Sequence, residues 1–341
     1  MSTPLDLSKR FLQLLFFYSG IGYETAKKIA QLGGRVILAC RSEERAKSAI
    51  ENMKKDTREK FANMKKKQYY MLLLFNQESA GEVPELNIEF MQLDLASFES
   101  TIEFARRYKD RGLPLHVLIC NAGLLGPDDR TMTADGFELH FQVNYLSHFL
   151  LTLLLLPLLK ESAPNCRIIN VSSEAHKWSE FKLDNIQGQK AYGVNKFYGN
   201  SKLYQVMNMH SLSKKLEGQR ISVFSLHPGF VETEIFRERT GCNAACIGCC
   251  LAVASKDPES GARTSLIAAL DPKYDDKTAL YFMAGKPANS TNLSRNTDKQ
   301  DILWTYSLQC LKKNLNDVIL QNIGEKLESI KELGDDTMTK E

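Results

Sequence analysis

The chain has 341 residues, of which 43% are hydrophobic, and its formal net charge is +3. This length suits one large α/β domain or two small domains, and the apolar share is enough for a substantial core. The small net charge argues against nucleic acid and against a strongly acidic partner. No long run of one charge sign predicts a charged tail.

The first elements form a strand–turn–helix–strand unit. Residues 11–18 are a continuous apolar run, typical of a strand that is buried on both faces. The turn Ser19-Gly20-Ile21-Gly22 follows, then helical spacing over 23–32 and a second strand over 35–40. Glycines in such a turn let a dinucleotide pyrophosphate approach the free N–H groups at the start of the helix. The unit therefore predicts a dinucleotide site.

The end of the second strand predicts which dinucleotide binds. An acidic residue there holds the ribose 2′-hydroxyl of NAD, whereas an arginine suits the 2′-phosphate of NADP. Here Cys40 is followed by Arg41, and the first carboxylate is that of Glu43. This favours NADP over NAD. The alternative is that Arg41 is an ordinary surface charge.

Strands and helices then alternate along the chain. The predicted strands have short apolar runs in common, and they lie at 87–93, 115–120, 167–171, 221–226 and 278–283. The alternation predicts an α/β fold, a single doubly wound parallel-sheet Rossmann domain with three α/β/α layers. Residues 57–86 fit neither a strand nor an amphipathic helix, so we interpret them as an insertion. The predicted domain spans 11–315 and is followed by a C-terminal tail at 316–341.

The apolar stretches and the cysteines indicate the cellular compartment of the protein. No stretch reaches the roughly 18 to 20 apolar residues of a membrane span. The apolar run 149–159 lies between His148 and Lys160 and is interpreted as a buried helix end. Three of the eight cysteines fall in predicted strands, which favours a reducing, cytoplasmic compartment. The cysteines at 242–250 have zinc-like spacing, but no nearby His or second Cys pair completes a site, so we expect no metal.

A tyrosine is followed four residues later by a lysine at three places, namely Tyr23/Lys27, Tyr192/Lys196 and Tyr198/Lys202. On a helix the two side chains of such a pair project from the same face. A nearby ammonium lowers the pKa of a phenol, which then exchanges protons more readily. The alternative for each pair is a solvated helix surface, so the surrounding motifs must select among them.

Those motifs follow the predicted strands in a fixed order. Two of them are the glycine turn and the pair Tyr198/Lys202. One more, Asn144, lies on the long helix predicted at about 134–160. The others lie at strand ends, and they are Asp94-Leu95, Asn121-Ala122-Gly123, Ser172-Ser173 and Pro228-Gly229 with Thr233. In this order they resemble the short-chain dehydrogenase/reductase family over roughly residues 15–315. Within the family the chain is most similar to the retinol-dehydrogenase branch and its relative, the WW-domain-containing oxidoreductase.

The resemblance implies a catalytic tetrad. Tyr198 would be the acid/base, Lys202 would lower its pKa and bind the nicotinamide ribose, Ser173 would bind the substrate oxygen, and Asn144 would hold a water in a proton relay. The residues implied to bind the cofactor are Ser19, Gly20, Ile21, Gly22, Arg41, Asp94, Asn121, Gly123, Tyr198, Lys202, Pro228, Val231 and Thr233. The implied reaction interconverts a carbonyl and an alcohol with NADP(H).

The chain also departs from the family pattern Thr-Gly-x-x-x-Gly-x-Gly. Its first two positions fall on Leu15 and Phe16, and a ring at the second position would stand where the phosphates pass. Two hypotheses therefore remain open at this point. One is an active NADP(H)-dependent oxidoreductase; the other is a catalytically impaired binding or scaffold protein that keeps the fold.

The sequence indicates the substrate only by class. Apolar residues in the loop after the sixth strand, about 230–260, favour a retinoid, a steroid or a lipid aldehyde, although ordinary packing explains them nearly as well. The chain also allows peripheral contact with a membrane and a homodimer.

Overall fold

The computed structural model describes residues 11–15, 20–62, 85–229 and 258–330. Within them lies one eight-stranded sheet in the order β3-β2-β1-β4-β5-β6-β7-β8. Its strands are β1 (Phe11–Leu15), β2 (Arg35–Cys40), β3 (Ile88–Gln92), β4 (Val117–Cys120), β5 (Cys166–Val171), β6 (Ile221–His227), β7 (Leu280–Met283) and β8 (Lys286–Ala288). All neighbouring strands are parallel except β8, which runs antiparallel to β7.

The strand order reverses between β1 and β4, as in a doubly wound fold. Ligands of such folds bind outside the carboxyl ends of the strands at this switch point. The predicted parallel sheet is therefore confirmed. The short strand β8 was not predicted, because it has only three residues and includes Pro287, which cannot donate to a ladder.

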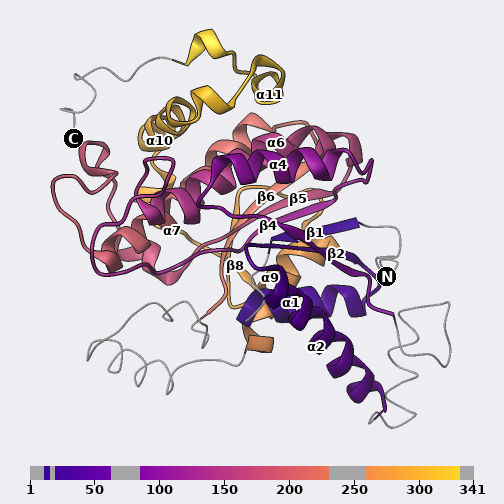
Figure 1. The fold of residues 1–341 in the computed structure, drawn as a ribbon. Coiled ribbons are helices and arrows are strands. Elements are labelled where there is room, and N and C mark those ends of the chain that lie inside the picture. The colour runs from indigo at the N-terminus through magenta and orange to yellow at the C-terminus, as the bar shows by residue number, and fades with distance from the viewer. Residues whose placement is uncertain (1–10, 16–19, 63–84, 230–257, 331–341) are drawn as a thin grey trace.

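Helices cover both faces of the sheet (Figure 1). On one face lie α1 (Gly20–Gln31), α2 (Glu43–Ala62) and α9 (Pro258–Leu270). On the other lie α4 (Phe98–Lys109), α6 (Ser147–Ser162) and α7 (Val194–Lys215), with α10 (Thr297–Cys310) and α11 (Asp317–Gln321) outside them. Two hydrophobic clusters fill the spaces between these layers and the sheet. The predicted three-layer α/β/α architecture is confirmed.

The longest apolar helical segment is part of this core. It joins α5 (Leu139–Phe141), the π-helical turn η2 (Gln142–Leu146) and α6. Among the described residues this segment alone has the length and composition of a membrane span, but 89% of its apolar window is buried inside the protein. The prediction that 149–159 is a buried part of a helix is thus confirmed.

Two predicted boundaries can be compared with the packing. Residues 57–62 continue α2, and the hydroxyl of Thr57 is buried and accepts a hydrogen bond from Gln31 Nε2 at 3.0 Å. Hence the predicted insertion 57–86 begins with helix, and its residues 63–84 lie outside the described part.

In the predicted C-terminal tail, Leu320 and Ile330 are buried in the same core as α6. Residues 316–330 therefore pack on the domain.

Candidate active site

The helix α7 carries Tyr198 and Lys202 one turn apart, as predicted. The Lys202 ammonium lies 5.8 Å from the centre of the Tyr198 ring. It is only 3% exposed and donates a hydrogen bond of 3.0 Å to the carbonyl of Val171, the last residue of β5. The pair is thus held at the carboxyl end of the sheet.

Burial shifts the pKa values of both groups. It lowers the pKa of Lys202 to about 8, and the nearby Cys120 thiol opposes this shift. It raises the pKa of Tyr198 to about 12, and a hydrogen bond with Ser173 opposes that shift. Desolvation of the phenolate is thus the largest effect on Tyr198 in this structure, and the lowering of the Tyr198 pKa by Lys202 stays a prediction.

The two adjacent serines have different contacts. The Ser173 side chain hydrogen-bonds to Tyr198 and also accepts the N–H of Ala175 at 3.2 Å. The Ser172 hydroxyl is buried and donates to the carbonyl of Lys202 at 2.7 Å, which fixes α7 to the end of β5. Of the two serines, Ser173 is therefore the one whose side chain contacts Tyr198.

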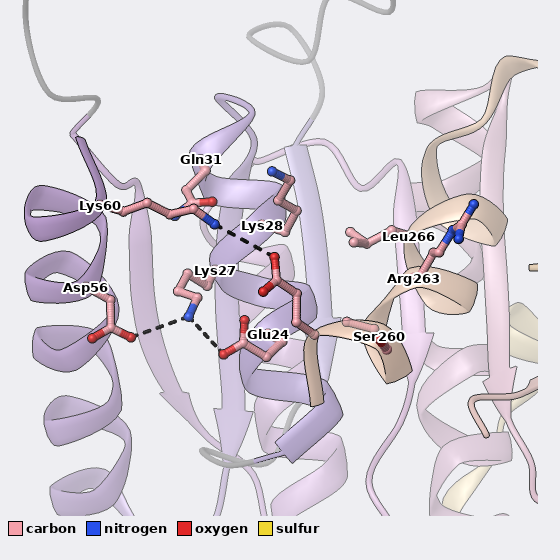
Figure 2. A pocket seen from close by; sticks show the side chains of 11 residues that line it. Glu24, Lys27, Lys28, Gln31, Asp56, Lys60, Ser260, Arg263 and Leu266 are labelled. Carbon is pink, nitrogen blue, oxygen red and sulfur yellow. Dashed lines mark hydrogen bonds and ion pairs between the residues drawn. The ribbon is translucent and has the colours of Figure 1, made fainter. Parts of the chain in front are cut away.

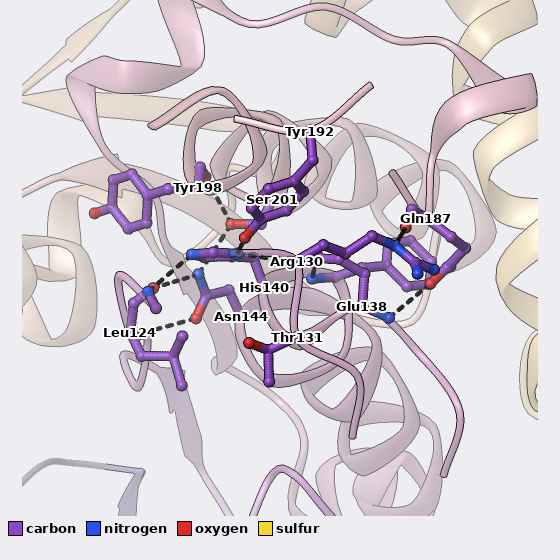
Figure 3. Close-up of polar contacts among 12 residues, drawn as sticks. Leu124, Arg130, Thr131, Glu138, His140, Asn144, Gln187, Tyr192, Tyr198 and Ser201 are labelled. Carbon is purple, nitrogen blue, oxygen red and sulfur yellow. Dashed lines mark hydrogen bonds and ion pairs between the residues drawn. The ribbon is translucent and has the colours of Figure 1, made fainter. Parts of the chain in front are cut away.

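Asn144 lies in η2, opposite α7 (Figure 3). Its amide nitrogen donates to the carbonyl of Leu124 at 2.9 Å and to the Ser201 hydroxyl at 3.0 Å, and its amide oxygen accepts the N–H of Leu124 at 2.8 Å. The neighbouring Gly123 has no space for a side chain: a Cβ there would lie 2.8 Å from Lys202 Nζ and 3.3 Å from Asn144 Oδ1. Asn144, Ser173, Tyr198 and Lys202 thus form one cluster, and π-turns are frequent at functional sites.

The predicted cofactor-binding residues lie along the same edge of the sheet where the structure describes them. Gly20 begins α1 with φ +63°, a conformation that favours glycine, and Ile21 and Gly22 follow in its first turn. Arg41 is exposed directly after β2. Asp94 accepts the N–H of Ala96 at 2.9 Å after β3.

Asn121 follows β4 and Pro228 follows β6, each half-buried. Ser19, Val231 and Thr233 lie outside the described residues, as do Phe16 and the cysteines at 242–250. Within the described ranges, no group of three His, Cys, Asp or Glu residues could hold a metal ion.

A buried carboxylate–imidazole pair was not predicted. Glu138 and His140 are fully buried, and Glu138 Oε1 lies 2.7 Å from His140 Nδ1. His140 Nε2 accepts the N–H of Gly126 at 2.9 Å, so the proton is on Nδ1 and is directed at the carboxylate. Figure 3 shows this pair beside Tyr192 and Tyr198. The sequence feature that could have pointed to this pair is the one-turn spacing of His140, Asn144 and His148 along one helix.

The other two tyrosine–lysine pairs do not form the site. The Tyr192 hydroxyl lies 3.4 Å from His140 Nδ1, so this residue borders the cluster without a lysine partner there. In the other pair, Tyr23/Lys27, the lysine forms ion pairs with Glu24 at 2.8 Å and with Asp56 at 3.3 Å. These groups line a cavity of about 320 Å³ between α1, α2 and α9 (Figure 2), and none of the tetrad residues lines it.

Comparison with known proteins places the chain in a family. A family profile described as short chain dehydrogenase matches residues 75–242. Human polyprenol dehydrogenase is 34% identical, over 85% of this chain and 81% of its own length. Human retinol dehydrogenase 11 is 35% identical over 86% of this chain and 83% of its own. The chain belongs to the short-chain dehydrogenase/reductase family.

Solved structures agree with the fold. A short chain dehydrogenase from Salmonella enterica aligns with a TM-score of 0.57 at 21% identity, over 84% of this chain and 100% of its own. An NADPH-bound short chain oxidoreductase from Pseudomonas aeruginosa aligns with a TM-score of 0.59 at 17% identity, over 84% of this chain and 100% of its own. These structures show the fold, and the relatives above show that the chain is an oxidoreductase-family protein related to retinol and polyprenol dehydrogenases.

Proposed function

We propose that this chain is an NADP(H)-dependent oxidoreductase that interconverts a carbonyl and an alcohol on an apolar substrate. The observation that carries the proposal is the cluster of Ser173, Tyr198 and Lys202 at the carboxyl end of β5, with Asn144 and Gly123 beside it. A phenol in contact with a hydroxyl, with an ammonium nearby, provides the groups needed to protonate a developing alkoxide.

The residues fit a dinucleotide. Gly20 opens α1, where free main-chain N–H groups attract phosphates, and Gly123 packs directly against Lys202, where the side chain of a larger residue would collide. We assign the 2′-phosphate to Arg41, the adenine to Asp94, the adjoining ribose to Asn121, and the nicotinamide to the segment from Pro228 to Thr233. When bound, the nicotinamide gives a hydride to the carbonyl carbon or accepts one from the alcohol.

The tetrad residues have separate roles in the proposed reaction. Because the pKa of Tyr198 is raised to about 12, its phenol is protonated at neutral pH and donates to the carbonyl oxygen. Ser173 orients that oxygen by a second hydrogen bond. Lys202, with a pKa lowered to about 8, is still mainly protonated at pH 7 and binds the nicotinamide ribose. Asn144 holds the water of the proton relay.

An apolar substrate is favoured by the relatives of this chain, which are retinol and polyprenol dehydrogenases. A retinoid, a steroid or a lipid aldehyde are the classes to test. A cytoplasmic location, peripheral membrane contact and a homodimer remain predictions.

A turnover assay tests the proposal. The wild-type chain is incubated with NADPH or NADH and a panel of retinoid, steroid and lipid carbonyls, with Tyr198→Phe as the inactive control. NADPH oxidation by the wild type, absent in the variant, supports the proposal. If NADPH raises the melting temperature without turnover of any carbonyl, the impaired binding protein is the better description. If neither nucleotide raises it, the cofactor assignment fails.

A further inference from the structure

A buried imidazole and a buried amide lie behind the tetrad and have no role in the reaction proposed above. His148 stands on α6, four residues after Asn144, and Gln205 stands on α7, three residues after Lys202. Each side chain is about one helical turn from a tetrad residue and on the same helix face. Both are 1% exposed.

The Gln205 amide joins the two helices. Its Nε2 donates to the main-chain carbonyl of Asn144 and lies 3.2 Å from His148 Nδ1. One turn nearer the tetrad, the Asn144 amide donates to the Ser201 hydroxyl at 3.0 Å. Two hydrogen-bonded contacts therefore connect Asn144 to α7. Its side-chain amide contacts Ser201, and its main-chain carbonyl contacts Gln205.

The chemistry of the partners fixes the orientation of these groups. A carbonyl only accepts, so the Gln205 atom that faces Asn144 must be the amide nitrogen. The same nitrogen faces His148 Nδ1, which must therefore accept, and the imidazole proton lies on Nε2. Burial lowers the pKa of His148 to about 3, with Lys202 acting in the same direction, so the ring stays neutral and remains an acceptor over the working pH range.

The contact matters because Asn144 lies in a π-turn, where the regular helical hydrogen-bond ladder is interrupted. The Gln205 amide donates one hydrogen to the main-chain carbonyl of Asn144 in this turn, and His148 Nδ1 accepts the second hydrogen of the same amide. Asn144 in turn holds Leu124, next to the glycine that borders Lys202.

We propose that Gln205, anchored by His148, is a positioning residue that holds the main chain of Asn144 and thereby the geometry of Asn144 and Lys202 in the tetrad. The proposal rests on the proposed function and adds a residue to it. Gln205 is buried behind the tetrad, and we assign it no contact with the substrate. Its effect should therefore fall on the chemical step and not on binding of the nucleotide.

Gln205→Met tests this, because methionine has a similar length and no donor. With NADPH and the best carbonyl of the panel, we expect kcat to fall about tenfold, which corresponds to ~1.4 kcal/mol, while KM and the NADPH Kd stay within about twofold. The matched control is Asn208→Leu, which removes a buried amide one turn further along α7 and outside the Asn144–His148 contact. It should leave kcat unchanged.

A second pair of variants covers the case in which Gln205→Met does not fold. His148→Asn places an acceptor near the position of Nδ1 and should keep kcat within about threefold, whereas His148→Leu removes the acceptor and should lower it as Gln205→Met does. The ¹⁵N resonances of His148, assigned with these variants, should show a neutral ring protonated on Nε2 in the wild type.

The outcomes separate this inference from the proposed function. A wild type that reduces no carbonyl overturns both. An active wild type overturns only this inference if Gln205→Met keeps full kcat, if Asn208→Leu loses as much as Gln205→Met, or if His148 carries its proton on Nδ1. Where Gln205→Met does not fold, equal kcat values for His148→Asn and His148→Leu also overturn it.

Discussion

The Lys202 ammonium donates to the carbonyl of Val171 at 3.0 Å and lies 5.8 Å from the ring centre of Tyr198. The lysine is thus fixed to the end of β5, and its ammonium lies over the face of the Tyr198 ring. Within the described part of the chain, the hydrogen-bond acceptor of this buried charge is one main-chain carbonyl. Lys202 therefore carries a large desolvation cost in its charged form, which leads to the first prediction.

Folding stability should depend on pH through Lys202. Its pKa is lowered by burial from 10.5 to about 8, so between these values the unfolded chain binds the proton and the folded chain does not. Stability from this group therefore rises as pH increases from about 8 to 10.5, by as much as about 3 kcal/mol. Tyrosines and cysteines also titrate there, so the measurement is the difference between wild type and Lys202→Met in urea unfolding. A difference that is constant across this window contradicts the prediction.

The two tyrosines near the site should behave differently. Tyr198→Phe removes the proton donor, so we expect turnover to fall by at least about a thousandfold with the NADPH Kd within about twofold. Tyr192→Phe removes only a hydroxyl 3.4 Å from His140 Nδ1, so we expect kcat within about threefold of wild type. Steady-state kinetics and nucleotide titration measure both. The reverse order of effects would show that Tyr192 is the acid.

Arg41 should set the nucleotide preference. It is exposed after β2, where an arginine pairs with a 2′-phosphate. We expect NADPH to bind at least about tenfold more tightly than NADH, a difference of ~1.4 kcal/mol. Arg41→Ala should remove this preference and leave NADH affinity unchanged. Fluorescence titration with both nucleotides provides the values, and equal affinities in the wild type would refute the assignment.

Gly123 should tolerate no side chain. In Gly123→Ala the new Cβ would lie 2.8 Å from Lys202 Nζ, so the ammonium must move away from Val171. We expect kcat to fall by about a hundredfold or more while the fold is retained, as monitored by circular dichroism. Gly193→Ala is the matched control, because its Cβ would meet only Lys196 Cβ, at 3.9 Å. Wild-type kcat in Gly123→Ala would show that Lys202 moves without consequence.

Local sequence patterns determined much of this protein. Short apolar runs and glycine turns predicted the parallel doubly wound sheet, because a buried strand and a helix start each need particular residues within a few positions. The order of the motifs along the chain resembles the short-chain dehydrogenase/reductase family, and this resemblance implied the tetrad residues.

Only the tertiary structure decided the environment of these residues. The upward shift of the Tyr198 pKa comes from burial of the phenol and is opposed by the hydrogen bond with Ser173. The contacts of Gln205 with Asn144 and His148 join residues 61 and 57 positions apart. No local pattern encodes such a contact, because burial and hydrogen-bond partners are set by how the helices pack across the sheet.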